Sequence, residues 1–152
     1  MASEVETAGP VSRGRAPLLY GVAAFVSLIG LADAIYLTAE HLSGRSVRCT
    51  LSGCSEVLSS PYATVRGYPL AGLGAIAYFA FFSLATLAAF GYRGVSKLLM
   101  LLVSVMFLTT LWLFYLQAFV IHHFCQYCLL SAAVTTTLTV LVFVASRKES
   151  AG

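Results

Sequence analysis

The sequence predicts an all-α membrane protein, a bundle of four transmembrane helices in up-down-up-down order with a short interfacial helix in the first outer loop. Hydrophobic residues make up 59% of its 152 residues and charged residues only 10%, whereas a soluble domain carries about a quarter charged residues. Apolar runs that can cross a ~30 Å hydrocarbon core, which takes roughly 20 helical residues, occur four times. These runs are residues 18–39, 69–90, 97–121 and 124–146.

The first run is predicted to be a retained helix rather than a cleaved secretory signal. It spans 22 residues, where a signal core takes about 7 to 15, and no small-x-small cleavage site closes it. Residues 1–16 mix Ser, Gly, Pro and both charge signs, so we expect a disordered tail there. Residues 17–147 then form one four-helix domain, and 148–152 form a second tail.

One connection between the runs is long and two are short. Residues 40–68 form the long loop, GYRGVS at 91–96 links the second and third runs, and His122 and His123 form barely a turn. Because short connections join neighbours, an up-down bundle is expected. The long loop has apolar residues at a spacing compatible with a short amphipathic helix interrupted near Pro61, or equally with a hydrated loop: Val57, Leu58, Tyr62 and Val65.

The basic residues predict the orientation. Six of the nine Lys and Arg residues flank the tails and the second connection, and three lie in the long loop. Since an excess of Lys and Arg marks the cytoplasmic side, we expect a multi-pass protein of the cell inner (cytoplasmic) membrane with both termini in the cytoplasm. The net charge of +3 is then explained by orientation and gives no reason to propose a nucleic-acid partner.

All four cysteines lie on the predicted outer side, which suits an oxidising compartment: Cys49, Cys54, Cys125 and Cys128. The last two form a C-x-x-C at the start of a helix, where unpaired N–H groups and the helix dipole stabilise a thiolate. One thiolate is thereby ready to attack, and the other, one turn on, can close a disulfide. All four are candidate catalytic residues.

Two other uses of four cysteines are possible. A zinc site would use the same sulfurs, but one cysteine lies about a turn inside an apolar helix, and we expect no metal. A purely structural pair of disulfides is the second possibility, although a four-helix bundle in lipid does not need one. Both are disfavoured against thiol–disulfide exchange between the two pairs.

Exchange suits the residues best. The TLSG segment between Cys49 and Cys54 is small and flexible enough to let the loop swing toward the fourth helix. A loop pair facing water can collect electrons from a soluble protein and pass them to the helix pair, which then needs an acceptor that lives in lipid. A quinone, ubiquinone or menaquinone, is the two-electron acceptor we expect.

Several motifs, in their order and spacing, resemble bacterial homologues of vitamin K epoxide reductase. The resemblance runs from about Leu28 to Leu141 and rests on AIYLT at 34–38, the loop cysteine pair, CSEVLSS at 54–60, RGYP at 66–69, and YLQAFVIHHFC leading into CQYC. It implies a four-helix bundle around a quinone. DsbB-type oxidases do the same job, but their C-x-x-C pair lies in the first outer loop, the reverse of the order here.

The resemblance also implies a role for each cysteine. Cys128 lies nearest the quinone, Cys125 is its disulfide partner, Cys54 exchanges with Cys125, and Cys49 meets the soluble partner. The family's loop serine, thought to help shape or hydrogen-bond the quinone environment, matches Ser60. The candidate quinone-binding residues are Ser60, Leu58, Tyr62 and Phe124.

The predicted function is therefore a membrane quinone-dependent thiol oxidoreductase that supports disulfide bond formation. Many bacterial members carry a fused thioredoxin-like domain, whereas this chain stops at Gly152, so we expect a separate thioredoxin-fold (DsbA-like) partner. Ala132 stands where the vertebrate enzymes have a tyrosine, which disfavours vitamin K epoxide chemistry. The alternatives are a vitamin K epoxide or quinone reductase proper, and a non-enzymatic, disulfide-stapled tetraspan scaffold.

For the other polar and aromatic residues we favour structural over functional roles. Asp33 lies in the first apolar run, and we favour a carboxyl that reaches the interface or a neighbouring helix over a proton carrier for a quinone. Adjacent histidines, His122 and His123, are expected to be inessential. The aromatics of the third run are expected to serve in packing more than in lining a quinone site: Trp112, Phe114 and Tyr115.

Overall fold

The computed structural model describes the backbone of residues 15–44, 61, 64–92 and 94–151. Among these residues, four helical segments are long and apolar enough to cross a membrane. They are α2 (Ala16–Leu42), α4 (Leu70–Ala89), α5 (Val95–Tyr115) continued by the π-helical turn η2 (Leu116–Ile121), and α6 (Gln126–Ala151). The predicted all-α membrane fold with four spanning helices is confirmed.

The four predicted apolar runs fall on these four helices. The up-down order relative to a membrane and the division into tail, domain and tail stay predictions. The predicted interfacial helix falls on loop residues 45–60 and 62–63, which lie outside the described part of the chain, as do residues 1–14 of the predicted tail. At the other end, α6 continues through Ala151 into the predicted second tail.

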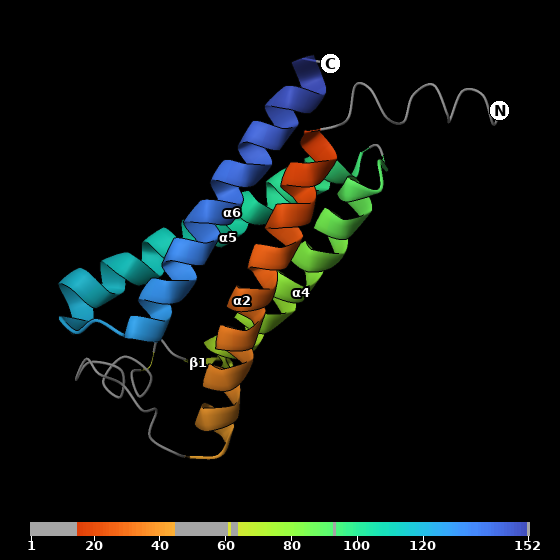
Figure 1. Ribbon diagram of the computed structural model, residues 1–152. Helices are drawn as coiled ribbons and strands as arrows, with labels where there is room; N and C mark the ends of the chain where they lie inside the picture. The colour runs from red at the N-terminus through yellow and green to blue at the C-terminus, as the bar shows by residue number, and fades with distance from the viewer. Residues whose placement is uncertain (1–14, 45–60, 62–63, 93, 152) are drawn as a thin grey trace.

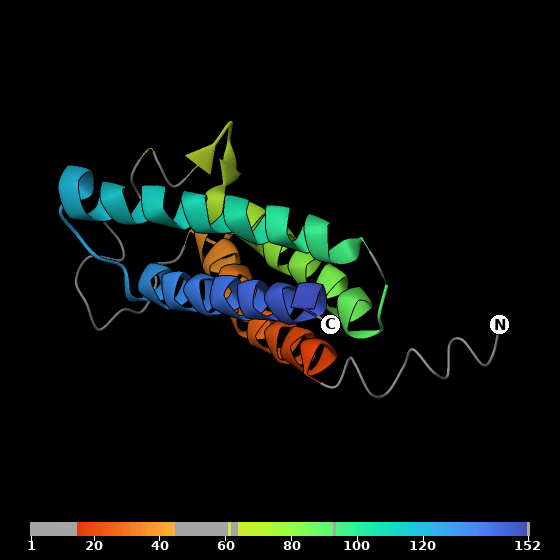
Figure 2. The same cartoon turned by 90° about the horizontal axis from the view of Figure 1, so that it is seen from above.

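Helix α2 packs mainly against α4 and α6, and α5 packs against α6 and α4. Figures 1 and 2 show α2 and α5 on opposite sides of the bundle, with α4 and α6 between them. The buried face of α2 is built from small residues, among them Ala23, Ala24, Ser27 and Ala34. Small side chains let backbones approach closely, which is how membrane helices gain packing energy without a hydrophobic driving force.

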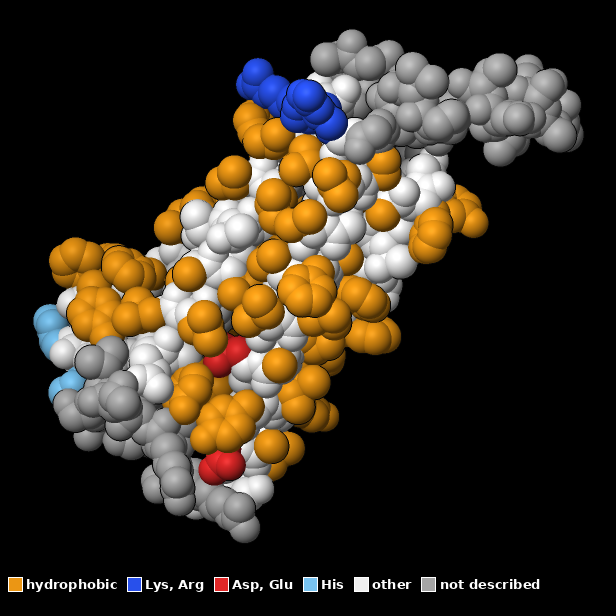
Figure 3. Space-filling model, viewed as in Figure 1, with side chains coloured by type: hydrophobic (Ala, Val, Ile, Leu, Met, Phe, Trp, Pro, Cys, Tyr) orange, Lys and Arg blue, Asp and Glu red, His pale blue; other side chains and the backbone are white. Residues whose placement is uncertain are grey.

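The outer surface of the bundle is apolar. Phe25 is 69% exposed, Ile76 67% and Leu108 64%, which favours a lipid environment over water. Figure 3 shows apolar side chains along the visible flank and Lys and Arg side chains gathered at the end where α2 begins and α6 ends. This distribution matches a bundle whose flanks contact lipid.

A tight hairpin, which the sequence analysis did not predict, leads into α4. Strands β1 (Thr64–Val65) and β2 (Tyr68–Pro69) pair antiparallel, with Val65 opposite Tyr68. The two turn residues between them, Arg66 and Gly67, have φ angles of 51° and 86°, as the favoured two-residue hairpin turns require. The hairpin delivers Pro69 to the N-terminal end of α4, where it helps to line the cavity described below.

Helices α2 and α4 approach each other closely where Gly30 faces the ring of Tyr78. A Cβ atom added at Gly30 would overlap ring carbons of Tyr78. Tyr78 itself is only 3% exposed, so its ring has no open space into which to move. Glycine at position 30 therefore allows a buried tyrosine between α2 and α6.

We expect Gly30→Ala to lower the thermal unfolding midpoint in detergent, because overpacking of this kind costs roughly 1–3 kcal/mol. The matched control is Gly21→Ala in the same helix, where nothing lies within 4 Å of the added Cβ and removal of a helical glycine should be neutral or stabilising by about 0.5–1 kcal/mol. Equal midpoints for the two variants would contradict the close packing.

Candidate functional site

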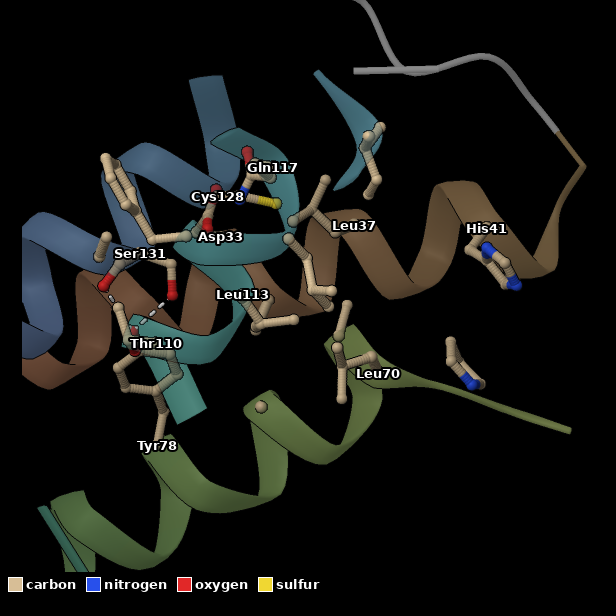
Figure 4. A pocket seen from close by; sticks show the side chains of 18 residues that line it. Asp33, Leu37, His41, Leu70, Tyr78, Thr110, Leu113, Gln117, Cys128 and Ser131 are labelled. Atoms are coloured by element: carbon tan, nitrogen blue, oxygen red, sulfur yellow. Dashed lines mark hydrogen bonds between the residues drawn. The ribbon is translucent and has the colours of Figure 1, made fainter. Parts of the chain in front are cut away.

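A cavity of about 140 Å³ lies where all four spanning segments meet. Most of its wall is apolar, with Leu37, Leu70 and Leu113 among the side chains that line it. Figure 4 shows Asp33 of α2, Gln117 of η2 and Cys128 of α6 gathered in one part of the wall. The polar groups are few and come from different helices, which is typical of a small-molecule site. They are Asp33, His41, Tyr78, Thr110, Gln117, Cys128 and Ser131.

Asp33 is buried in the wall, with 8% of its surface exposed. Its Oδ2 atom has no hydrogen-bond donor among the described residues. The side chains of Asp33, Leu37 and His41 follow one another at a spacing of four, so they share one face of α2 and all line the cavity. Within the described residues, Oδ2 therefore makes no bond to a neighbouring helix, whereas the expectation that Asp33 reaches the interface stays a prediction.

Tyr78 joins α4 to α6 through its hydroxyl. The Tyr78 Oη atom lies 2.7 Å from Ser131 Oγ and 2.9 Å from Thr135 Oγ1, and it donates to the Ser131 carbonyl at 3.2 Å. Ser131 and Thr135 follow Cys128 at three and seven residues, which places them on the same face of α6. The network fixes the rotation of α6 that turns Cys128 toward the cavity.

Gln117 lies in the π-helical turn η2 at the end of the third span. It is 4% exposed, and its Oε1 atom accepts the backbone N–H of Cys125 at 3.0 Å. The turn ends at His122, which has a left-handed φ of 59°. A π-helical turn shifts the side chains that follow it and is frequent at functional sites. Here it positions the Gln117 amide against the start of α6.

Cys125 and Cys128 occupy different environments at the start of α6. Cys125 is fully buried, whereas Cys128 is partly exposed and lines the cavity. The Cys125 carbonyl accepts the N–H of Leu129 at 3.0 Å, so the helix begins at this residue. Within the described residues no disulfide joins the two cysteines.

The thiol of Cys125 has a pKa lowered to about 7. The largest cause is the hydrogen bond with the Cys128 thiol, and the backbone N–H groups of Cys128 and Tyr127 lower the pKa further. Burial acts in the opposite direction. The thiolate is the reactive form of cysteine, and this lowered pKa favours the thiolate of Cys125 near neutral pH.

The model of the vitamin K epoxide reductase family matches residues 22–143, most of the chain. The chain belongs to the vitamin K epoxide reductase family. No curated protein matches it. Membership of this family supports the general class of membrane thiol–disulfide oxidoreductases and quinone reductases. The apolar cavity, the C-x-x-C pair at its edge and the unpartnered Asp33 oxygen fit that class.

The structure brings together part of the site predicted from the sequence. Cys125 and Cys128 pack against each other, and Cys128 lines the cavity. The ring of Phe124 lies 5.9 Å from that of Phe114, which lines the cavity, whereas Phe124 itself does not. The remaining predicted site residues lie outside the described part of the chain, and their roles stay predictions: Cys49, Cys54, Leu58, Ser60 and Tyr62.

The aromatic residues of the third span and the two histidines that follow it fall into two groups, those that line the cavity and those that do not. Trp112 and Tyr115 stack at 5.8 Å between ring centroids and are both about half exposed, on the outer side of α5. His122 and His123 are exposed and do not line the cavity. Phe114 is the aromatic residue of this group that reaches the cavity wall.

Sequence reasoning missed Tyr78, Gln117 and Ser131. Gln117 did carry a signal, because an amide inside an apolar run must find a partner within the protein. Tyr78 and Ser131 carried none, since tyrosine and serine are common in membrane helices and only the packing of α4 on α6 brings these two together.

The lowered pKa of Cys125 predicts a titration near neutral pH. In a Cys49→Ala, Cys54→Ala background, the ultraviolet absorbance of one thiolate should appear as the pH rises through about 7. The protein below that pH holds the thiol and above it the thiolate. Adding Cys128→Ala removes the largest cause of the shift, so the midpoint should move upward. A first thiolate that appears only near pH 9 in the unchanged pair would contradict this geometry.

Proposed function

We propose that the protein is a quinone-dependent thiol oxidoreductase. It passes electrons from a soluble thioredoxin-fold (DsbA-like) protein through Cys49/Cys54 and Cys125/Cys128 to a quinone, and so supports disulfide bond formation. The observation that carries this proposal is the position of Cys128 in the wall of an apolar cavity surrounded by all four spanning segments. A lipid-soluble oxidant can reach that sulfur from within the bilayer.

The size of the cavity supports a ring-shaped occupant. A cavity of about 150 Å³ lined by apolar side chains is known to hold a benzene molecule, and this one measures about 140 Å³. One six-membered quinone ring fits that volume, and its isoprenoid tail then lies outside, between helices or in lipid. When bound, the quinone supplies the two-electron oxidising power.

The two helix cysteines take part in two successive reactions, exchange with the loop pair and reduction of the quinone. The Cys54 thiolate attacks Cys125 in the Cys125–Cys128 disulfide, and Cys49 then closes a disulfide with Cys54 and releases Cys125. A thiol of lower pKa leaves faster, so the pKa of about 7 at Cys125 suits it to this release. Two electrons then pass from the dithiol to the quinone, the two thiol protons are released and the quinone takes up two protons, as the Cys125–Cys128 disulfide forms again.

The proposed orientation follows the charges. Arg15, Arg147 and Lys148 are exposed at the end where α2 begins and α6 ends, and Figure 3 shows this basic cluster. The positive-inside rule assigns that end to the cytoplasm. The opposite end, with Cys125 and Cys128, then faces the outer side of the inner membrane, where a soluble partner can be oxidised.

The relay predicts that quinone reduction needs Cys128. Purified protein in detergent is mixed with a reduced DsbA-like protein and a soluble quinone analogue, and quinone absorbance is followed. Cys128→Ala should reduce the rate to that of the mixture without enzyme. Ser83→Ala, which removes an exposed hydroxyl bonded only to its own helix, is the control and should keep the wild-type rate. Absence of partner-dependent reduction by folded wild type would favour the stapled scaffold.

The order of the cysteines predicts a trapped intermediate. In Cys49→Ala the resolving thiol is gone, so Cys54 and Cys125 should accumulate as a mixed disulfide that mass spectrometry identifies. A trapped disulfide between a different pair of cysteines would contradict the assigned roles while leaving quinone reduction itself intact.

A further inference from the structure

The cavity contains a carboxyl group that the cysteine relay does not use. We propose that Asp33 is a proton relay between the Cys128 thiol and the quinone oxygen nearest to it. The proposal rests on the proposed function, because it assigns a residue to the quinone-reduction step. It follows from burial, from the missing partner and from the bonding of the other groups in the same wall.

Burial and isolation are the first evidence. Asp33 is 8% exposed, within a membrane-spanning segment, and its Oδ2 atom has no donor among the described residues. An ionised group at this depth is expensive and marks a functional site by default. Among the described residues no Lys or Arg lines the cavity, so neither offers Asp33 an ion pair there. As an acid, the carboxyl carries one O–H donor.

The hydroxyl groups and the amide of the wall are already engaged. The Tyr78 hydroxyl is bonded to Ser131 and Thr135, and Thr110 Oγ1 donates to the Met106 carbonyl at 2.8 Å. The Gln117 amide cannot release a proton at neutral pH, and its Oε1 atom already accepts the Cys125 N–H. His41 lines the cavity two turns along α2 from Asp33. Asp33 is thus the acid in this wall that has an open oxygen.

Position is the second line of evidence. Asp33 and Cys128 both line the cavity, and Figure 4 shows them in the same part of its wall, away from Leu70 and His41. A ring that contacts the Cys128 sulfur in this cavity presents an oxygen to the same part of the wall. The titratable groups that face Asp33 across the cavity are Tyr78 from α4 and Cys128 from α6, with His41 on its own helix.

Bonds, electrons and protons are all accounted for in this step. The S–S bond forms between Cys125 and Cys128, two S–H bonds break, and two electrons reduce the quinone to the quinol. Asp33 gives its proton to one quinone oxygen and takes the proton of the Cys128 thiol, so it ends as it began. The Cys125 proton leaves to water, and the second oxygen takes a proton from water.

Single-turnover oxidation tests the relay. Protein in the Cys49→Ala, Cys54→Ala background is reduced and mixed with a soluble quinone analogue, and the thiols that remain are counted by alkylation and mass. General acid–base groups contribute about 10²–10⁴-fold, so Asp33→Asn, which keeps the shape but cannot relay a proton, should slow disulfide formation at least about 100-fold. Asp33→Glu should restore part of the rate.

Two further measurements separate chemistry from structure. Equilibrium binding of the quinone analogue should weaken less than about tenfold in Asp33→Asn, in keeping with the loss of one hydrogen bond. Infrared difference spectra on quinone binding should show a carboxyl band in the wild type that Asp33→Asn lacks. Ser27→Ala, a buried hydroxyl of the same helix bonded to its own backbone and away from the cavity, should match the wild type throughout.

Each outcome has one meaning. Wild-type rates in Asp33→Asn would overturn the relay and leave the proposed function in place. Loss of quinone binding in both Asp33→Asn and Asp33→Glu would make Asp33 a binding group and also overturn the relay. Failure of the wild-type dithiol to be oxidised by any quinone analogue would instead overturn the proposed function.

Discussion

The need to satisfy polar groups without water governs this structure. A spanning helix satisfies its own backbone, and most hydroxyls inside the spans bond the carbonyl one turn earlier, as Thr86 and Thr139 do. Where a helix start or a buried hydroxyl needs a partner from elsewhere, a second helix provides it: Gln117 for the Cys125 N–H, and Ser131 with Thr135 for Tyr78. These contacts define the cavity wall. Asp33 Oδ2 is the buried side-chain atom in the described residues that remains unsatisfied, which is why it indicates chemistry.

The same constraint separates the two helix cysteines. Cys125 lies at the helix start, where the Cys128 thiol and backbone N–H groups stabilise its thiolate. Their effect exceeds that of burial, so the pKa of Cys125 falls to about 7. Cys128 lies one turn further along and faces an apolar cavity. In the proposed relay, Cys125 exchanges with Cys54 and Cys128 contacts the quinone. This asymmetry arises from the position of a C-x-x-C at the junction of a turn and a spanning helix.

Hydropathy and cysteine spacing predicted the four spans and the C-x-x-C pair, because both depend on local sequence. The wall of the cavity could not be predicted in this way. Gly30 matters only because Tyr78 packs on it from 48 residues away, and the π-helical turn that aims Gln117 leaves no recognisable pattern in YLQAFV. The Arg66–Gly67 hairpin was missed because strands of two residues are too short for periodicity to reveal. The burial of Asp33 and the missing donor for its Oδ2 atom could not be predicted either, because both depend on packing rather than on spacing.

The proposed relay depends on a quinone ring in the cavity beside Cys128. Photolabelling with an azido-quinone, followed by peptide mapping of the labelled sites, tests it most directly. We expect labels on two cavity-lining segments, around Leu113 to Gln117 and Cys128 to Ala132. An excess of unlabelled quinone analogue should suppress this labelling. Labels confined to lipid-facing side chains such as Trp112 and Phe119, with no suppression by competitor, would contradict it.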